Sequence, residues 1–207
     1  MRIIIMRFPV NSESTGEREI RHLRYQLEAR FGARVNVSGF DFDCRAFLDL
    51  RRNQYSSSAI IKLLERYLSS SAVKVLAVTG LDLGNPVLTF VFGEARLNGQ
   101  CAIVSSYRLD NKFYGLPDNP ALSQERLLKE AIHELGHTYG LFHCHNSECV
   151  MQSTTYVEEI DFKSSRFCDK CWDKLDNVGG LPENAALFSQ VPGRMPGRDE
   201  AGNSLGL

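Results

Sequence analysis

Cysteine, net charge and long apolar runs are all scarce in this chain. Only 6 of the 207 residues are cysteine, too few for the disulfide framework of a small secreted domain. Lys and Arg number 24 and Asp and Glu 25, so no basic excess draws the chain to nucleic acid or an anionic membrane. The apolar stretch at residues 3–6 is far shorter than a membrane span or a signal-peptide core. We therefore expect a soluble cytoplasmic protein without nucleic-acid or membrane partners.

The rest of the composition is that of an ordinary globular protein. Hydrophobic residues make up 43% and charged residues 24%, which excludes collagen-like, coiled-coil and wholly disordered chains. A chain of this size buries about 70% of its unfolded surface and needs no disulfides to fold. At roughly 150 residues per domain, the length predicts one large unit with a smaller one. We expect an N-terminal α/β subdomain over 1–140 and a C-terminal subdomain over 141–207.

Apolar periodicity predicts alternating strands and helices in the first part of the chain. We expect strands at 1–9, 34–40, 73–78, 87–97 and 101–109, and helices at 17–31, 58–70 and 121–139. Asn98-Gly99 indicates a hairpin between the last two strands, and Ser123 is the expected N-cap of the last helix. This order predicts an α/β fold with a mixed, mostly parallel twisted sheet and an antiparallel edge strand. Residues 191–207 have no apolar period, and we expect them to be mobile or loosely docked.

Residue types that bind metals gather in the second half of the sequence. Four of the five histidines lie between His133 and His145, and four of the six cysteines lie between Cys144 and Cys171. In a reducing compartment, clustered cysteines bind metal more often than they form disulfides. This concentration points to metal chemistry.

The segment from His133 to His137 reads His-Glu-Leu-Gly-His within the last expected helix. Residues four apart share one helix face, so both imidazoles can bind one zinc ion, with Glu134 beside them to handle a water proton. Gly140 allows a left-handed turn, after which His143 supplies the third ligand of a catalytic site with one open position. The alternative is an amphipathic helix with surface histidines. These residues at fixed offsets argue against it, since chance would place them so in roughly one chain in 10⁵ of this composition.

Two cysteine pairs follow the histidines. Cys168 and Cys171 form a CxxC pair, and Cys144 and Cys149 form a looser one. Pairs about 20 residues apart match a structural four-cysteine zinc site. In an extended segment His143 and its neighbour face opposite sides, so the two sites can lie close together. A redox CxxC pair, buried thiols, or His145 in place of one cysteine are the alternatives, and we interpret the isolated Cys44 and Cys101 as small buried residues.

The stretch HELGHTYGLFH resembles the extended zinc signature of the metzincin metallopeptidases. Its continuation through four cysteines and Met151 is similar to the archaemetzincins in particular, and the motif covers 133–171. The resemblance implies that His133, His137 and His143 bind a catalytic zinc ion and that Glu134 is the general base. It also implies that Met151 is the methionine of the Met-turn, packed beneath the metal, and that the four cysteines hold a second zinc ion.

The resemblance also implies a fold and a way of binding substrate. The fold would be a metzincin-like zincin with a smaller, zinc-stapled C-terminal subdomain. The antiparallel edge strand would bind an extended peptide by strand addition, and the segment after Met151 would wall the pocket. Some metzincins have a tyrosine ligand two residues past that methionine. Ser153 stands there, which leaves Tyr156 as a loose candidate for oxyanion stabilisation.

We therefore expect a monomeric zinc metallopeptidase with two zinc ions that acts on peptides or unfolded proteins. The alternative is a catalytically silent zinc protein that binds a peptide strand, but a pure binder has no need of Glu134 as a base. A zinc-ribbon module for nucleic acid is a third reading, which the near-neutral charge argues against. We interpret the basic residues near the second cysteine pair as a solvated face: Lys163, Arg166, Lys170 and Lys174.

Overall fold

The computed structural model describes residues 2–8, 16–39, 42–68 and 73–177. A five-stranded sheet forms its centre, in the order β2-β1-β5-β8-β7. The strands are β1 (Arg2–Arg7), β2 (Arg34–Gly39), β5 (Val73–Thr79), β7 (Gly93–Ala95) and β8 (Cys101–Ser105). β1 pairs with β2 and β5 in parallel, β5 pairs with β8 in parallel, and β7 alone is antiparallel. The mixed sheet with an antiparallel edge strand is therefore confirmed.

The edge strand is shorter than expected. The expected strand covered 87–97, whereas β7 covers only Gly93–Ala95. The side chain of Asn85 accepts hydrogen bonds from the backbone N–H groups of Val87 and Leu88, which makes a local turn that competes with a strand. Arg52 donates to the carbonyl oxygens of Asn85, Leu88 and Thr89, which occupies backbone acceptors that a longer strand would use.

A second, three-stranded sheet has no counterpart among the expected elements. It has the order β3-β4-β6 and consists of β3 (Leu48–Asp49), β4 (Gln54–Ser56) and β6 (Leu83–Gly84). Short 3₁₀ turns occur at Cys44–Phe47, Tyr107–Leu109 and Asn111–Tyr114. Strands of two or three residues carry too little periodicity to be recognised in a sequence.

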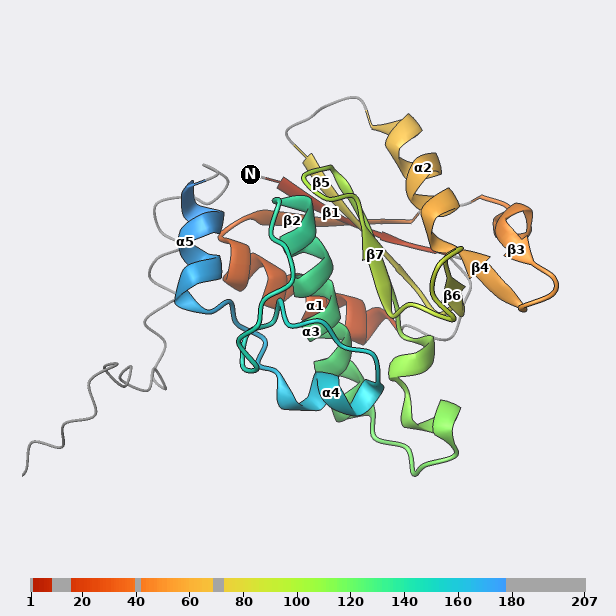
Figure 1. Ribbon diagram of the computed structural model, residues 1–207. Helices are drawn as coiled ribbons and strands as arrows, with labels where there is room; N and C mark the ends of the chain where they lie inside the picture. Colours follow the sequence, from red (N-terminus) through yellow and green to blue (C-terminus); the bar gives the residue numbers. More distant parts are fainter. Residues whose placement is uncertain (1, 9–15, 40–41, 69–72, 178–207) are drawn as a thin grey trace, which may run out of the picture.

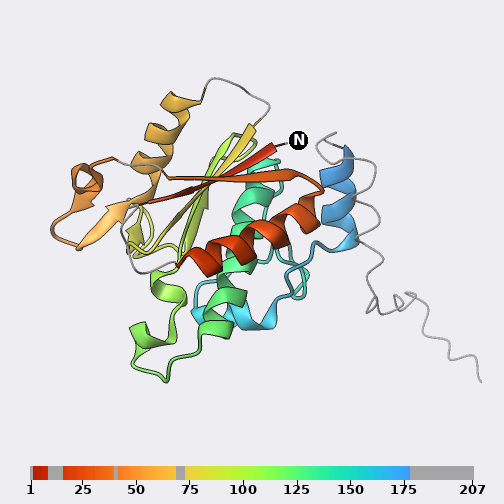
Figure 2. The same cartoon turned by 180° about the vertical axis from the view of Figure 1, so that it is seen from behind.

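Helices cover both faces of the main sheet (Figure 1). They are α1 (Glu17–Phe31), α2 (Ser57–Tyr67), α3 (Pro120–Thr138), α4 (Val157–Phe162) and α5 (Asp169–Asn177). α1 and α3 lie on one face and α2 on the other, as the view from behind also shows (Figure 2). Among the described helices, none is both long and apolar enough to cross a membrane.

The first turn of α3 differs from the expectation. Its N-cap is Asn119, whose side chain accepts a hydrogen bond from the backbone N–H of Leu122, and not Ser123. Pro120 explains the earlier start, because its fixed φ suits the first helical position and its missing N–H costs nothing there. Ser123 instead donates its hydroxyl to the carbonyl of Asn119.

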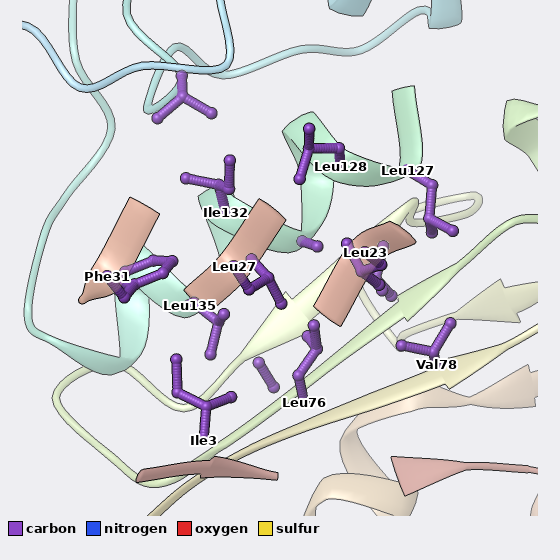
Figure 3. Packing of buried hydrophobic residues seen from close by; sticks show 14 of the residues in the cluster. Ile3, Leu23, Leu27, Phe31, Leu76, Val78, Leu127, Leu128, Ile132 and Leu135 are labelled. Carbon is purple, nitrogen blue, oxygen red and sulfur yellow. The ribbon is translucent and has the colours of Figure 1, made fainter. Parts of the chain in front are cut away.

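The larger core lies between the sheet and the helices α1 and α3. Leu23, Leu27 and Phe31 of α1 meet Ile132 and Leu135 of α3 over the sheet (Figure 3). Fully burying each such side chain contributes about 1.5–3 kcal/mol. The same core continues past residue 140 into residues 149–151 and the helices α4 and α5. The division at 140 stays a prediction, and residues 178–207, with the expected loose tail, lie outside the described residues.

Candidate active site and metal centres

Three imidazoles converge at the C-terminal end of α3. His133 and His137 lie one turn apart on that helix, and His143 approaches from the segment that follows it. Their candidate ligand nitrogens all lie within 4.8 Å of one another. The Nε2 atoms of His133 and His137 are 3.0 Å apart, close to the roughly 3.3 Å that two nitrogen ligands keep in a tetrahedral zinc site.

Backbone carbonyls orient two of these rings. Nδ1 of His133 donates to the carbonyl of Val150 at 2.8 Å, and Nδ1 of His137 donates to the carbonyl of Leu141 at 2.6 Å. A carbonyl can only accept, so the proton of each ring is on Nδ1 and the lone pair of each Nε2 points at its neighbour. Two facing lone pairs repel unless a cation lies between them, so the donor set fits a zinc ion.

The turn after α3 is built around Gly140. This residue has φ +85°, in the left-handed region that glycine adopts without steric cost, as expected. Leu141 N–H donates back to the carbonyl of Gly136 and closes the helix. Two other segments contact this end of α3. Asn98 N–H, in the turn between β7 and β8, donates to the carbonyl of His137, and Lys74 Nζ, on β5, donates to that of Thr138 at 2.8 Å.

Glu134 is buried between α3 and the edge strand β7. A side chain at Gly93 would place its Cβ 2.6 Å from Glu134 Cγ and 2.7 Å from the carbonyl oxygen of Ile103. The strand therefore passes directly against this carboxyl group. Burial raises the pKa of Glu134 well above its usual range, and the neighbouring carboxylate of Glu130 adds to this shift. A carboxylate with a raised pKa is a stronger proton acceptor than an exposed one.

Burial has the opposite effect on the histidines. It lowers the pKa of His133, His137 and His143, and the positive charge of Lys163 contributes to each shift. A lowered pKa keeps an imidazole neutral at neutral pH. Neutral imidazole is the form that binds a metal ion.

The four clustered cysteines also come together. The Sγ atoms of Cys144, Cys149, Cys168 and Cys171 lie within 4.8 Å of one another, and all four thiols are free. Cys144 Sγ is 3.7 Å from Cys168 Sγ. Two sulfur ligands of a tetrahedral zinc site lie about 3.8 Å apart, so this distance fits such a site. Backbone N–H groups reach this cluster, since Cys168 N–H donates to Cys149 Sγ at 3.3 Å. The set fits a thiolate-bound zinc ion, and the exposed His145 is not part of it.

Met151 links the two groups of ligands. It is buried under α3, with its sulfur 2.5 Å from the position that a Cβ on Gly136 would take. Its carbonyl accepts from Cys144 N–H at 2.8 Å. Cys144 directly follows His143, so both candidate centres depend on the same backbone pairing.

A cavity of 570 Å³ opens over the histidines. Its walls include Glu134, the edge strand β7 and the segment 153–155. Ser153 lines the cavity, whereas Tyr156 is 66% exposed and is not among the lining residues. The backbone N–H of Tyr156 donates to Glu159 at the start of α4, so the structure does not bring this tyrosine to the site.

The expectation of a solvated basic face is wrong at Lys163. Its side chain is fully buried and its Nζ lies 2.8 Å from Glu130 Oε1, whereas Arg166, Lys170 and Lys174 are exposed. The sequence carried one signal for this pair. Glu130 stands three residues before His133 and four before Glu134, on the same helix face.

Comparison with known proteins agrees with this geometry. The family model described as Peptidase family M54 matches residues 24–177. The archaemetzincin of Methanocaldococcus jannaschii is 38% identical over 178 residues, which cover 86% of this chain and 97% of the relative. The archaemetzincin of Pyrococcus abyssi is 37% identical over 75% of this chain and 81% of its own length.

Solved structures show the same likeness. The archaemetzincin structure from Methanopyrus kandleri has a TM-score of 0.75 and 31% identity and covers 86% of this chain and 94% of its own. The structure from Archaeoglobus fulgidus, complexed with malonate, has a TM-score of 0.70 and 35% identity, with coverage of 84% and 99%. The chain therefore belongs to peptidase family M54, the archaemetzincins, a family of zinc metallopeptidases.

Proposed function

We propose that this chain hydrolyses peptide bonds, with His133, His137 and His143 as ligands of a catalytic zinc ion and Glu134 as general base. The observation that carries the proposal is the convergence of three imidazoles beside a buried carboxyl group in an open cavity. A zinc ion bound there would lower the pKa of a water molecule and polarise the scissile carbonyl. The protein contributes the orientation of the rings, through the Val150 carbonyl on His133 in particular.

Glu134 has the position and the environment of a general base. It follows His133 directly on α3, is buried, and lines the same cavity as the three histidines. Its carboxylate would take the proton of the attacking water and return it to the leaving amine. The raised pKa favours the first of these steps, because the group accepts a proton more readily than an exposed carboxylate does.

The edge strand β7 supports an extended peptide as the substrate. It is the last strand of the main sheet, and both Gly93 and Glu94 line the cavity. An extended chain can pair with the free edge of such a strand, and segment 153–155 would then lie on its far side. Peptides and unfolded proteins present extended backbone in this way, whereas folded domains do not.

We propose further that the protein is a monomer with two zinc ions per chain, the second held by the four cysteines. Elemental analysis with native mass spectrometry tests this stoichiometry. Two zinc ions in the wild type, falling to one in His137→Ala, is the expected result. A single ion that survives His137→Ala would show that only the cysteine site holds metal in the isolated protein, and would contradict two occupied sites.

The general base is tested with Glu134→Gln, which keeps the shape of the side chain and removes its basicity. We expect this variant to keep both zinc ions and to lose about 10²–10⁴-fold in kcat on a peptide library. Glu125→Gln, on an exposed part of the same helix, is the matched control and retains activity. Hydrolysis by Glu134→Gln at the wild-type rate would contradict the mechanism, and zinc-loaded wild type that binds peptides without cleaving them would establish the silent binder.

A further inference from the structure

Three basic side chains are buried in the described part of the chain: Arg126, Lys129 and Lys163. The contacts of Lys163 differ from those of the other two. Arg126 pairs with Asp161 through two hydrogen bonds of 2.7 Å, and Lys129 donates to the carbonyl of Ile160 at 3.1 Å. Both side chains therefore fasten α3 to α4. Lys163 instead reaches a residue on the cavity wall and a carbonyl of the turn beneath the histidines.

The first partner of Lys163 is Glu130. Its side chain is only 4% exposed, and its Oε1 lies 2.8 Å from Lys163 Nζ. Glu130 lines the cavity together with His133 and Glu134, and it precedes Glu134 by one helical turn. The ion pair is therefore attached to the face of α3 that carries the candidate active site.

The second partner is the backbone of Gln152, whose carbonyl accepts from Lys163 Nζ at 3.2 Å. Gln152 follows Met151 directly, and Val150 supplies the carbonyl that receives Nδ1–H of His133. One ammonium group thus joins the helix that carries His133 to the turn that orients its ring.

The buried ion pair between Lys163 and Glu130 is unfavourable to desolvate, which argues for a role beyond packing. Burying an ammonium and a carboxylate carries a large desolvation penalty, and apolar side chains of similar volume often replace such a pair without loss of stability. Core packing alone therefore does not explain Lys163. Of its two contacts, Glu130 lies within four residues of His133 and Glu134, and Gln152 lies two residues from Val150, whose carbonyl accepts from His133 Nδ1.

We propose that Lys163 is a positioning residue of the active site, which holds α3 and the turn at 150–152 in the register that aims His133 and Glu134. This inference rests on the proposed function and adds a residue to it. Lys163 is buried and does not line the cavity, so it acts through Glu130 and Gln152. Groups of this kind behind metal ligands typically change metal affinity or activity about 10- to 100-fold when removed.

The first test compares Lys163→Met with Lys129→Met, a matched variant that removes an equally buried lysine from α3. We expect Lys163→Met to lower kcat about 10- to 100-fold with KM changed less than about threefold, and to weaken zinc binding at the histidine site by a similar factor. Lys129→Met should lower the melting temperature while kcat per zinc-loaded site and zinc affinity stay at wild-type values. Equal losses of kcat and affinity in the two variants would overturn the proposal.

The second test separates positioning from simple charge balance. Glu130→Gln/Lys163→Met leaves no unpaired buried charge, so it should recover the melting temperature that Lys163→Met loses. It still lacks a donor for the Gln152 carbonyl, so we expect kcat and zinc affinity to stay low. Recovery of both to wild-type values would show that Lys163 only neutralises Glu130, and would overturn the proposal.

Zinc affinity at the histidine site tests the role of Lys163 without any measurement of catalysis. It is measured with Zn²⁺ alone, by native mass spectrometry against a graded chelator, and the ion absent from His137→Ala identifies the histidine site. Absence of peptidase activity in the zinc-loaded wild-type protein would contradict the proposed function. The comparison of Lys163→Met with Lys129→Met by zinc affinity would still decide the positioning role.

Discussion

The missing side chain at Gly93 lets the edge strand lie against Glu134. A Cβ there would lie 2.6 Å from Glu134 Cγ and 2.7 Å from the carbonyl oxygen of Ile103. Real Cβ atoms do not approach this closely, and one of the two obstacles is backbone that cannot rotate away. A side chain at this position must therefore move either the strand or the carboxyl group.

Gly93→Ala should consequently impair catalysis more than stability. A displacement of the proposed base by about 1 Å can cost about 10²-fold in rate, so we expect kcat to fall by up to that factor while both zinc ions remain. Steady-state kinetics with zinc analysis measures this. Gly115→Ala is the control: Gly115 has φ +70° with open space around it, so alanine there strains the backbone by about 1–2 kcal/mol and leaves kcat unchanged. Wild-type kcat in Gly93→Ala would contradict the close packing.

At the scale of the element, α3 is held at both ends and along one side. Asn119 caps its N-terminus, and Arg126 pairs with Asp161 of α4 near its middle. Lys74 donates to the Thr138 carbonyl and the Asn98 N–H to the His137 carbonyl at its C-terminus. The helix dipole and the free carbonyls at that end favour the positive charge of Lys74. The histidines thus project from a helix with little freedom to shift.

Four buried or partly buried groups determine how the stability of the zinc-free histidine site changes with pH. They are His133, Glu134 and His137 on α3 and His143 after it. Burial lowers the pKa of the three histidines below the value of about 6.5 that they have when unfolded. The unfolded chain then binds more protons below pH 6.5, so stability is present above that pH and lost as the pH falls. Glu134, with a raised pKa, opposes this trend, because its ionised form is penalised as the pH rises.

Three histidines outweigh one carboxyl group, so stability should rise from pH 5 to about 6.5. Urea unfolding at a series of pH values, with zinc kept in the cysteine site, measures this profile. Glu134→Gln should make this rise with pH steeper, because it removes the opposing contribution of Glu134. A profile that is flat across this range would show that the histidines are not held neutral by burial.

Among the elements, sequence patterns predicted long periodic segments well and short ones poorly. α1 is found at the expected 17–31, with Ile20, Leu23, Leu27 and Phe31 buried. The edge strand was expected to be longer because four of the five residues at 87–91 are apolar. Their path is set by the Asn85 side chain and by Arg52, which is more than 30 residues away in the sequence. A pattern within one segment cannot contain that contact.

At the scale of the whole molecule, the candidate metal ligands could be predicted from the sequence, whereas Lys163, which positions them, could not. The histidines and the cysteines stand at short, fixed spacings, so the sequence alone indicated which of them meet, and the structure brings them together. Lys163 reaches Glu130 across 33 positions of the chain, through the packing of α4 on α3. Without that packing Lys163 looked like one of several exposed basic residues. Long-range burial, rather than residue type, decides its role.

The cysteine cluster ties the end of the described chain to the active site. Cys149 is buried in the core that begins under the main sheet, and Cys171 belongs to α5. Cys149 is followed by Val150, which orients His133, and Cys144 N–H binds the Met151 carbonyl. Burial raises the pKa of the Cys149 thiol to about 11. A bound cation would reverse this penalty, because it favours the thiolate.

Loss of the cysteine site should therefore affect the whole molecule and not only its C-terminal part. We expect Cys168→Ser to release the second zinc ion, to lower the melting temperature by more than about 10 °C, and to weaken zinc binding at the histidines through residues 150 and 151. Native mass spectrometry and thermal unfolding measure these effects, with Cys44→Ser, outside both clusters, as the control. Unchanged metal content and melting temperature in Cys168→Ser would refute a structural zinc site. Loss of one zinc ion with unchanged affinity at the histidines would show instead that the two centres are independent, because the shared backbone at 150–151 would then hold its position without the metal.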